Sequence, residues 1–370
     1  MARAPEDRDL LVLGVESSCD DTAAAVVLSR AGGERQILSN VALAQYERHA
    51  AFGGIVPEIA ARAHVERIDG VIAQAVESSG HTYADLDAIA VTAGPGLIGG
   101  VMVGLAAAKA VALAHSKALA PLNHLEGHAL SARMTDDVDF PYLLLLVSGG
   151  HTQLIEVSGV GSYRRLGTTI DDAAGEAFDK SAKLLGLDQP GGPMIEIAAR
   201  SGRSDRYGFP RPLAKREGFD FSLSGLKTAL RLEAEAISSP GRQHIADLAA
   251  SFQSAIAAHL ADRTSRAMEA LAAAGAPQVL VVAGGVAANQ EIRARLTALT
   301  TARGWRLVAP PARYCTDNGA MIAWAGIERI RAGLTPSFEE ALAFAPRARW
   351  PLAEPIAGRE HGGGKKGPRA

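Results

Sequence analysis

Two histidines four residues apart, His124 and His128, are the strongest candidates for chemistry in this chain. On a helix, both imidazoles would point from the same face and could bind one metal ion. In metalloproteases with the H-E-x-x-H motif, the general-base glutamate directly follows the first histidine. Here Glu126 stands one position later, so that on a helix it projects roughly 200° around the axis from His124. The spacing favours metal binding and argues against protease chemistry; two ordinary histidines near a helix end are the alternative.

A carboxylate near the end of the chain, Asp317, could complete this pair. It lies in the segment Cys315–Gly319, which precedes a predicted helix from Ala320 to Arg331. Two histidines and one carboxylate on a metal with open positions suit Fe(II) or catalytic Zn(II). Asp317 could equally be the N-cap of the predicted helix. The sequence spacing leaves both roles open.

The elements that must position these residues show an internal duplication. Apolar runs between residues 10 and 28 flank the polar loop Glu16–Thr22, and apolar runs between residues 142 and 157 flank the polar loop Ser148–Thr152. Each pattern predicts a strand, a small turn and a second strand. Two such hairpins indicate an α/β fold that is built twice.

Each half also contains a glycine-rich loop between a predicted buried strand and a predicted helix. Gly94–Gly100 leads into an alanine-rich helix that we expect to extend through Leu119, and Gly284–Asn289 leads into a second helix. Backbone amides in such loops, helped by the helix N-terminus, bind phosphate oxygens. Four small-residue turns in two matching halves favour a nucleotide or an acyl phosphate as ligand; turns without a ligand are the alternative.

A cluster of four carboxylates follows Thr169 in another predicted helix. Asp171 and Asp172 suit a first helical turn, where the helix dipole favours acids. Glu176 and Asp179 lie deeper and could accept hydrogen bonds from ribose hydroxyls. The following Pro-Gly-Gly-Pro turn at 190–193 permits close backbone approach to a ligand, or only turns the chain.

Composition limits the class of protein. The chain has 370 residues, 48% of them hydrophobic, and a net charge of -2, so it suits about two globular domains and nothing global indicates nucleic acid. Its two cysteines suggest a reducing compartment, and we expect a cytoplasmic protein. The apolar stretch Leu97–Ala114 contains Lys109 and favours a buried helix over a membrane span.

The domain boundaries follow from these patterns. We expect a first domain at 9–135, a second at 140–319, a C-terminal helix at about 320–345 that packs back onto the first domain, and a disordered tail at 354–370. Within the second domain, the segment Arg200–Glu217 has six basic residues against two acidic ones. It is the best local candidate for contact with a polyanion, and a solvated basic loop is the alternative.

These segments belong to an ordered set of motifs: Gly14–Thr22, Phe52–Glu58, Gly94–Gly100, His124–His128, Ser148–Thr152, Asp171–Lys180, Phe221–Thr228, Ala283–Asn289 and Cys315–Gly319. With this set the chain resembles the family of tRNA N6-adenosine threonylcarbamoyltransferases, above all its bacterial members, from about Leu10 to Ala345. The resemblance implies two duplicated actin-like domains of the sugar-kinase and Hsp70 type around a central nucleotide cleft.

The resemblance also implies an activity, a metal and partners. The reaction would transfer the threonylcarbamoyl group from threonylcarbamoyl-AMP to N6 of the adenosine just 3′ of the anticodon, in tRNAs that read codons beginning with A. The family's metal ligands fall on His124, His128 and Asp317, which would hold one Fe(II) per subunit, with Zn(II) as the alternative. Its nucleotide and substrate contacts fall on Leu146, Val147, Ser148, Gly149, Gly150, Asp179, Gly192 and Asn289. Expected partners are tRNA, the paralogous protein TsaB and the small ATPase TsaE, without a membrane.

The chain departs from the family pattern at two positions. Asn123 stands where many relatives have histidine, and Gln189 stands where an aromatic residue often precedes the Pro-Gly-Gly-Pro turn. No pair of residues suggests a nucleophile with its base, so we expect the threonylcarbamoyl group to pass directly to tRNA without a covalent enzyme intermediate. An ATPase or kinase of the same fold, a metal-dependent protease and a nucleotide-gated scaffold are the alternative functions.

Overall fold

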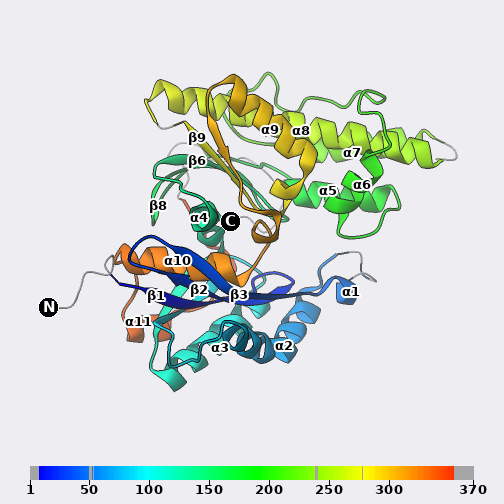
Figure 1. Cartoon of the computed structure of the whole chain (residues 1–370). Helices are drawn as coiled ribbons and strands as arrows, with labels where there is room; N and C mark the ends of the chain where they lie inside the picture. Colours follow the sequence, from blue (N-terminus) through cyan, green and yellow to red (C-terminus); the bar gives the residue numbers. More distant parts are fainter. Residues whose placement is uncertain (1–7, 50–51, 53, 238–240, 277, 354–370) are drawn as a thin grey trace. The chain divides into compact units, whose positions relative to one another are not determined.

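The computed structural model describes residues 8–49, 52, 54–237, 241–276 and 278–353, which form two compact units (Figure 1). The first unit contains the chain up to Val138 together with Thr316–Leu352, and the second contains Asp139–Cys315. The chain thus returns to its first unit after completing the second. The tail expected at 354–370 lies outside the described residues.

A five-stranded sheet with the order β3-β2-β1-β4-β5 forms the centre of the first unit. Its strands are β1 (Leu10–Glu16), β2 (Asp21–Ser29), β3 (Arg35–Ala44), β4 (Ala88–Gly94) and β5 (Ala118–Asn123). Strands β1, β2 and β3 pair antiparallel, whereas β1, β4 and β5 pair parallel. The parallel strands therefore end at one edge of the sheet, where loops can gather functional side chains.

Helices cover both faces of this sheet. They are α2 (Pro57–Ser78), α3 (Ile98–His115), α4 (His124–Thr135), α10 (Gly319–Arg331) and α11 (Phe338–Ala343); the short helix α1 (Tyr46–His49) follows β3. Leu11, Leu13 and Val15 of β1 belong to the apolar core that α2 and α3 cover. The alternate residue Gly14 faces α10, where a Cβ atom would lie 2.2 Å from the carbonyl oxygen of Gly319. The twofold periodicity of the strand thus explains why α10 packs so closely.

The alanine-rich helix α3 is shorter than predicted. It ends at His115, Ser116 adopts the left-handed conformation with φ 52°, and the following Ala118–Asn123 is strand β5. The prediction through Leu119 was wrong because Ser116 ends the helix in the left-handed conformation without the glycine that usually marks such an end, and the apolar residues after Lys117 suit a helix or a strand. Among the described residues, α3 is the one helix long and apolar enough to cross a membrane; its buried residues belong to the core with α2 and β4.

The second unit repeats this arrangement. Its sheet has the order β10-β9-β6-β7-β8, with β6 (Tyr142–Val147), β7 (Thr152–Gly159), β8 (Ser162–Thr168), β9 (Val279–Ala283) and β10 (Arg306–Val308). Strands β6, β7 and β8 pair antiparallel, and β6, β9 and β10 pair parallel. The duplication predicted from the two hairpins is confirmed by these matching sheets.

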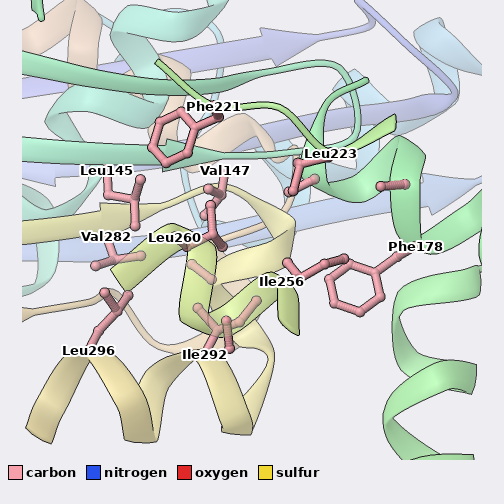
Figure 2. Packing of buried hydrophobic residues seen from close by; sticks show 14 of the residues in the cluster. Leu145, Val147, Phe178, Phe221, Leu223, Ile256, Leu260, Val282, Ile292 and Leu296 are labelled. Atoms are coloured by element: carbon pink, nitrogen blue, oxygen red, sulfur yellow. The ribbon is translucent and has the colours of Figure 1, made fainter. Parts of the chain in front are cut away.

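Helices α8 (Arg242–Ala273) and α9 (Gln290–Ala302) close the core of the second unit (Figure 2). The other elements are α5 (Ala174–Leu184), α6 (Gly191–Ala199), α7 (Ser224–Glu235) and the short 3-10 helices Gly285–Ala288 and Ala312–Tyr314. Figure 2 shows Leu145 and Val147 of β6 above Leu260 of α8, with Ile292 of α9 and Phe178 of α5 at the border of the same cluster. This packing fixes the loops at the ends of β6 and β9.

A buried histidine in this core predicts sensitivity to acid. His259 of α8 is 5% exposed and accepts a hydrogen bond from the Ser222 amide at 3.2 Å. Burial, aided by the Arg263 charge, lowers the pKa of His259 to about 4. The unfolded chain therefore binds more protons, so this histidine's contribution is complete above its ordinary pKa and is lost as the pH falls. Denaturant unfolding of wild type and His259→Gln should show about 2 kcal/mol more acid-induced loss in wild type between about pH 8 and pH 5. Equal losses of stability in wild type and His259→Gln would contradict this prediction.

Candidate functional site

The two histidines of the sequence motif and Asp317 meet in the first unit. His124 and His128 lie in the first turns of α4, and Asp317 lies just before α10. One ligand atom from each residue lies within 4.8 Å of the other two. The Asp317 Oδ1 atom is 3.1 Å from His128 Nε2 and 3.5 Å from His124 Nε2. The Nε2 atoms thus converge on one carboxylate, as a mononuclear metal site requires.

The start of α4 is fixed by the sheet and by its cap. Helix α4 begins directly after β5, and the Asn123 side chain caps it by accepting a hydrogen bond from the Leu125 amide at 2.9 Å. The same side chain donates to the Trp350 carbonyl at 2.9 Å. Asn123 therefore ties helix α4 to the C-terminal segment of the unit.

The N-cap of α10 is Asn318, whose side-chain oxygen accepts a hydrogen bond from the Met321 amide at 2.9 Å. This assignment rules out the capping role for Asp317 that the sequence left open. Asp317 instead faces the two histidines.

Carboxylates crowd around the three candidate ligands. Burial, reinforced by the charges of Asp317, Asp20 and Glu16, raises the pKa of Asp21 to about 8. Burial opposes protonation of His124, but the Glu16 and Asp317 carboxylates outweigh it and raise the pKa of His124 to about 9. Nearby negative charge contributes to both shifts, and a bound divalent cation would neutralise it. The donor set and its surroundings therefore fit a metal ion.

Glu126 has a different role. It is 1% exposed and forms an ion pair with Arg329 of α10 at 3.1 Å. Arg329 lies near the C-terminal end of α10, whereas Asp317 precedes its N-terminus. Glu126 thus joins two helices, which agrees with the sequence argument against a zinc protease.

Five of the predicted nucleotide contacts, Leu146 to Gly150, lie at the end of β6 and in the turn after it, in the second unit. The Gly175 amide donates to the Ser148 carbonyl at 3.1 Å, and the Glu176 amide donates to the Gly149 carbonyl at 3.1 Å. The start of α5 therefore packs directly on this turn. Gly149 and Gly150 are exposed, with no atom within 4 Å of the place of a Cβ. A ligand can approach their backbone closely.

The remaining predicted contacts lie in two other places of the second unit. The Asp179 carboxylate accepts a hydrogen bond from the Gly191 amide at 2.8 Å, next to Gly192. Asn289 caps α9 and donates to Gln253 at 2.8 Å. It also lies 3.4 Å from a carboxylate oxygen of Glu196, a residue of α6 that carried no recognisable signal in the sequence.

Asp171 and Asp172 do not lie in the first turn of α5, which begins only at Ala174. The Asp171 carboxylate accepts hydrogen bonds from the amides of Leu223 and Ser224 at the start of α7. Asp172 forms ion pairs with Lys180 and Lys227. The dipole assignment to α5 was wrong because both acids precede that helix, and Asp171 instead binds amides at the start of α7, about fifty residues further along the chain.

The basic segment 200–217 lies on the surface of the second unit, and its six cationic residues are exposed. Side chains of α8 form hydrogen bonds with the backbone at the end of this segment. Arg263, which is 0% exposed, donates to the carbonyls of Arg216 at 2.9 Å and Gly218 at 3.0 Å. Arg266 also donates to the Arg216 carbonyl. The segment therefore presents its charges on a fixed backbone.

Comparisons with known proteins find similarity to one named family over most of the chain. The family model described as TsaD, tRNA N6-adenosine threonylcarbamoyltransferase, matches residues 36–324. A protein named tRNA N6-adenosine threonylcarbamoyltransferase from Chelativorans sp. (strain BNC1) is 58% identical over 363 residues, covering 97% of this chain and 99% of the relative. A protein of the same name from Agrobacterium fabrum (strain C58 / ATCC 33970) is 56% identical over 369 residues, covering 98% of this chain and 99% of the relative.

Solved structures confirm the predicted two-domain actin-like α/β fold. The T. kodakarensis HypF structure has a TM-score of 0.56 at 17% identity, covering 88% of this chain and 48% of that one. Full-length HypF in its phosphate- and nucleotide-bound form has a TM-score of 0.54 at 12% identity, covering 90% of this chain and 56% of that one. At such identities the likeness concerns the fold alone.

Proposed function

The chain belongs to the family of tRNA N6-adenosine threonylcarbamoyltransferases, and we propose that His124, His128 and Asp317 hold the metal ion used in this acyl transfer. The observation that carries the proposal is the convergence of the three ligand atoms within 4.8 Å of one another. Two imidazoles and a carboxylate suit Fe(II), which we favour, and also Zn(II). When bound, either ion would supply a Lewis acid for the threonylcarbamoyl carbonyl.

The donor in this proposal is threonylcarbamoyl-AMP. In the turn Ser148–Gly150, the amides of Gly149 and Gly150 would contact its phosphate, supported by the exposed backbone of these glycines. The Ser148 amide already donates to the His151 carbonyl at 2.8 Å. Asp179, Gly192 and Asn289 would contact the rest of the nucleotide, as the family resemblance implies. Each of these residues belongs to the second unit.

The transfer itself would be direct. The adenine N6 atom attacks the carbonyl carbon of the threonylcarbamoyl group and the new C–N bond forms. The bond from this carbon to the phosphate oxygen breaks, AMP leaves with the bonding electron pair, and the proton lost from N6 passes to solvent. Amide donors at the phosphate stabilise the departing charge. The target, the adenosine 3′ of the anticodon in tRNAs that read codons beginning with A, lies in a single-stranded loop and can enter a pocket without duplex opening.

The decisive experiment combines the protein with threonylcarbamoyl-AMP, an unmodified tRNA and its partners, and detects the modified nucleoside by mass spectrometry. Modification is the expected result. ATP turnover without modification would support a kinase or ATPase instead, and peptide cleavage that needs Asp317 but not tRNA would support a protease. A trapped threonylcarbamoylated protein would contradict direct transfer.

TsaB and TsaE are the protein partners that we infer from the family. Exposed apolar side chains on two adjacent helices support a protein contact: Val65 of α2 is 64% exposed, and Met102 and Leu113 of α3 are 54% and 56% exposed. We assign this surface to TsaB. Since both cysteines are free thiols and the substrate is tRNA, we infer a cytoplasmic location.

The basic segment 200–217 would bind the tRNA backbone. Reversing two of its exposed charges in Arg211→Glu/Lys215→Glu should weaken tRNA binding and lower the slope of log affinity against log salt by about one per lost phosphate contact. Arg62→Glu on α2, a charge reversal at another exposed arginine, is the matched control. Filter binding at several salt concentrations measures both quantities. An unchanged slope in the double variant would remove the segment from the tRNA site.

A further inference from the structure

A buried glutamate at the end of β1 lies directly behind one of the metal ligands. Glu16 is 1% exposed, and its Oε2 atom is 2.8 Å from the Nδ1 atom of His124. This contact is on the opposite side of the imidazole from Nε2, which faces Asp317. The sequence did not single out Glu16, although a charged residue that closes a buried strand is a usable signal.

We propose that Glu16 is a positioning residue that holds His124 in the tautomer whose Nε2 lone pair is available to the metal. The inference rests on the proposed metal site and names a group that this site needs beyond its three ligands. It follows from the hydrogen bonds of the carboxylate.

The Glu16 carboxylate is surrounded by donors. Its Oε1 atom accepts from the Ser18 amide at 2.6 Å, and its Oε2 atom accepts from the Thr92 hydroxyl at 2.5 Å. An ionised carboxylate can only accept hydrogen bonds, so the proton between Oε2 and the imidazole must belong to His124 Nδ1. A neutral histidine with a proton on Nδ1 has a lone pair on Nε2. Carboxylates that hold ligand histidines in this way also raise their basicity toward metals.

The sheet makes this arrangement rigid. Glu16 ends β1, and Thr92 lies in the neighbouring parallel strand β4; each directly follows the paired residues Val15 and Val91. His128 has no equivalent support, because its buried Nδ1 atom has no hydrogen-bond partner within the described part of the chain. Loss of the Glu16 carboxylate should therefore disturb one ligand of the pair and leave the other in place.

Glu16→Gln tests the proposal because it removes the charge with little change in volume. The side-chain amide of the variant can take two orientations. If its NH2 group faces Ser18, two hydrogen-bond donors meet. If it faces His124, Nδ1 must accept a hydrogen bond, so the ring proton moves to Nε2, where the metal should bind. We expect Zn(II) to bind about 10- to 100-fold more weakly to the metal-free variant than to wild type. Competition with a chromophoric chelator measures this affinity, and ¹⁵N correlation spectra of the Zn(II)-loaded proteins should show the proton on His124 Nδ1 in wild type and its loss in the variant.

Glu126→Gln is the matched control. It makes the same substitution at another buried glutamate close to the metal ligands, which pairs with Arg329. It should lower thermal stability and leave the Zn(II) affinity unchanged. Glu16→Asp, which keeps a carboxylate, should restore part of the affinity and the wild-type tautomer.

Three outcomes separate the possibilities. Zn(II) affinity of wild-type strength in Glu16→Gln, together with its loss in His128→Ala, would overturn the positioning role alone. Equal losses of affinity in Glu16→Gln and Glu126→Gln would also overturn it, because general damage to α4 would explain both. Unchanged Zn(II) affinity in His128→Ala would instead overturn the proposed metal site.

Discussion

Replacing His128 with alanine is expected to abolish binding of the metal ion and to slow tRNA modification at least ~100-fold. His128 is 0% exposed, and its Nε2 atom lies 3.1 Å from Asp317. The variant would leave one histidine and one carboxylate, too few ligands for a stable site of this type. Lewis-acid activation is worth several kcal/mol, and each 1.4 kcal/mol corresponds to about tenfold in rate. Metal content by mass spectrometry and initial rates of nucleoside formation measure the two effects.

Two further variants separate the loss of the metal ligand from other effects of the substitution. His128→Gln fills most of the same volume, so a loss shared with alanine cannot be attributed to a cavity. His115→Ala changes an exposed histidine at the end of α3, whose ring stacks on Tyr83 at 4.7 Å, and should keep both metal and activity. Full modification by metal-free His128→Gln would show that the metal does not take part in the transfer.

The duplicated fold could be predicted because its strongest signals are local. The hairpin β1–β2 and the segment around Ser148–Thr152 combine continuous apolar runs with small polar turns, and the structure has strands at both places. Prediction failed where the same apolar sequence pattern is compatible with both a helix and a strand. The helix predicted through Leu119 extends past the end of α3 at His115 and into the start of β5 at Ala118.

The candidate metal site could be predicted only in part. The spacing of His124 and His128 is a helical signal, but Asp317 lies 189 residues from His128 in sequence, and only the fold brings them together. Spacing alone also could not separate a ligand from a cap, since Asp317 and Asn318 are adjacent and both residue types cap helices. Glu16 escaped prediction because its role depends on contacts with Thr92 and His124, which come from different elements.

The glycine at the start of α10 should control both the stability of the first unit and the place of Asp317. A Cβ atom on Gly319 would lie 2.4 Å from the Ala25 nitrogen and 2.5 Å from the Ala24 carbonyl carbon, both backbone atoms of β2. Gly319→Ala must therefore push the first turn of α10 away from the sheet. Overpacking of this kind costs about 1–3 kcal/mol.

The same shift should weaken metal binding, because Asp317 precedes Gly319 by two residues and metal–ligand distances tolerate only about 0.2 Å. Denaturant unfolding and Zn(II) competition on Gly319→Ala measure the two effects separately. Gly70→Ala in α2 is the control, since a Cβ atom there meets no atom within 4 Å and should stabilise the helix by about 0.5–1 kcal/mol. Reduced stability with unchanged Zn(II) affinity would mean that the loop before α10, rather than the packing of the helix on β1 and β2, places Asp317.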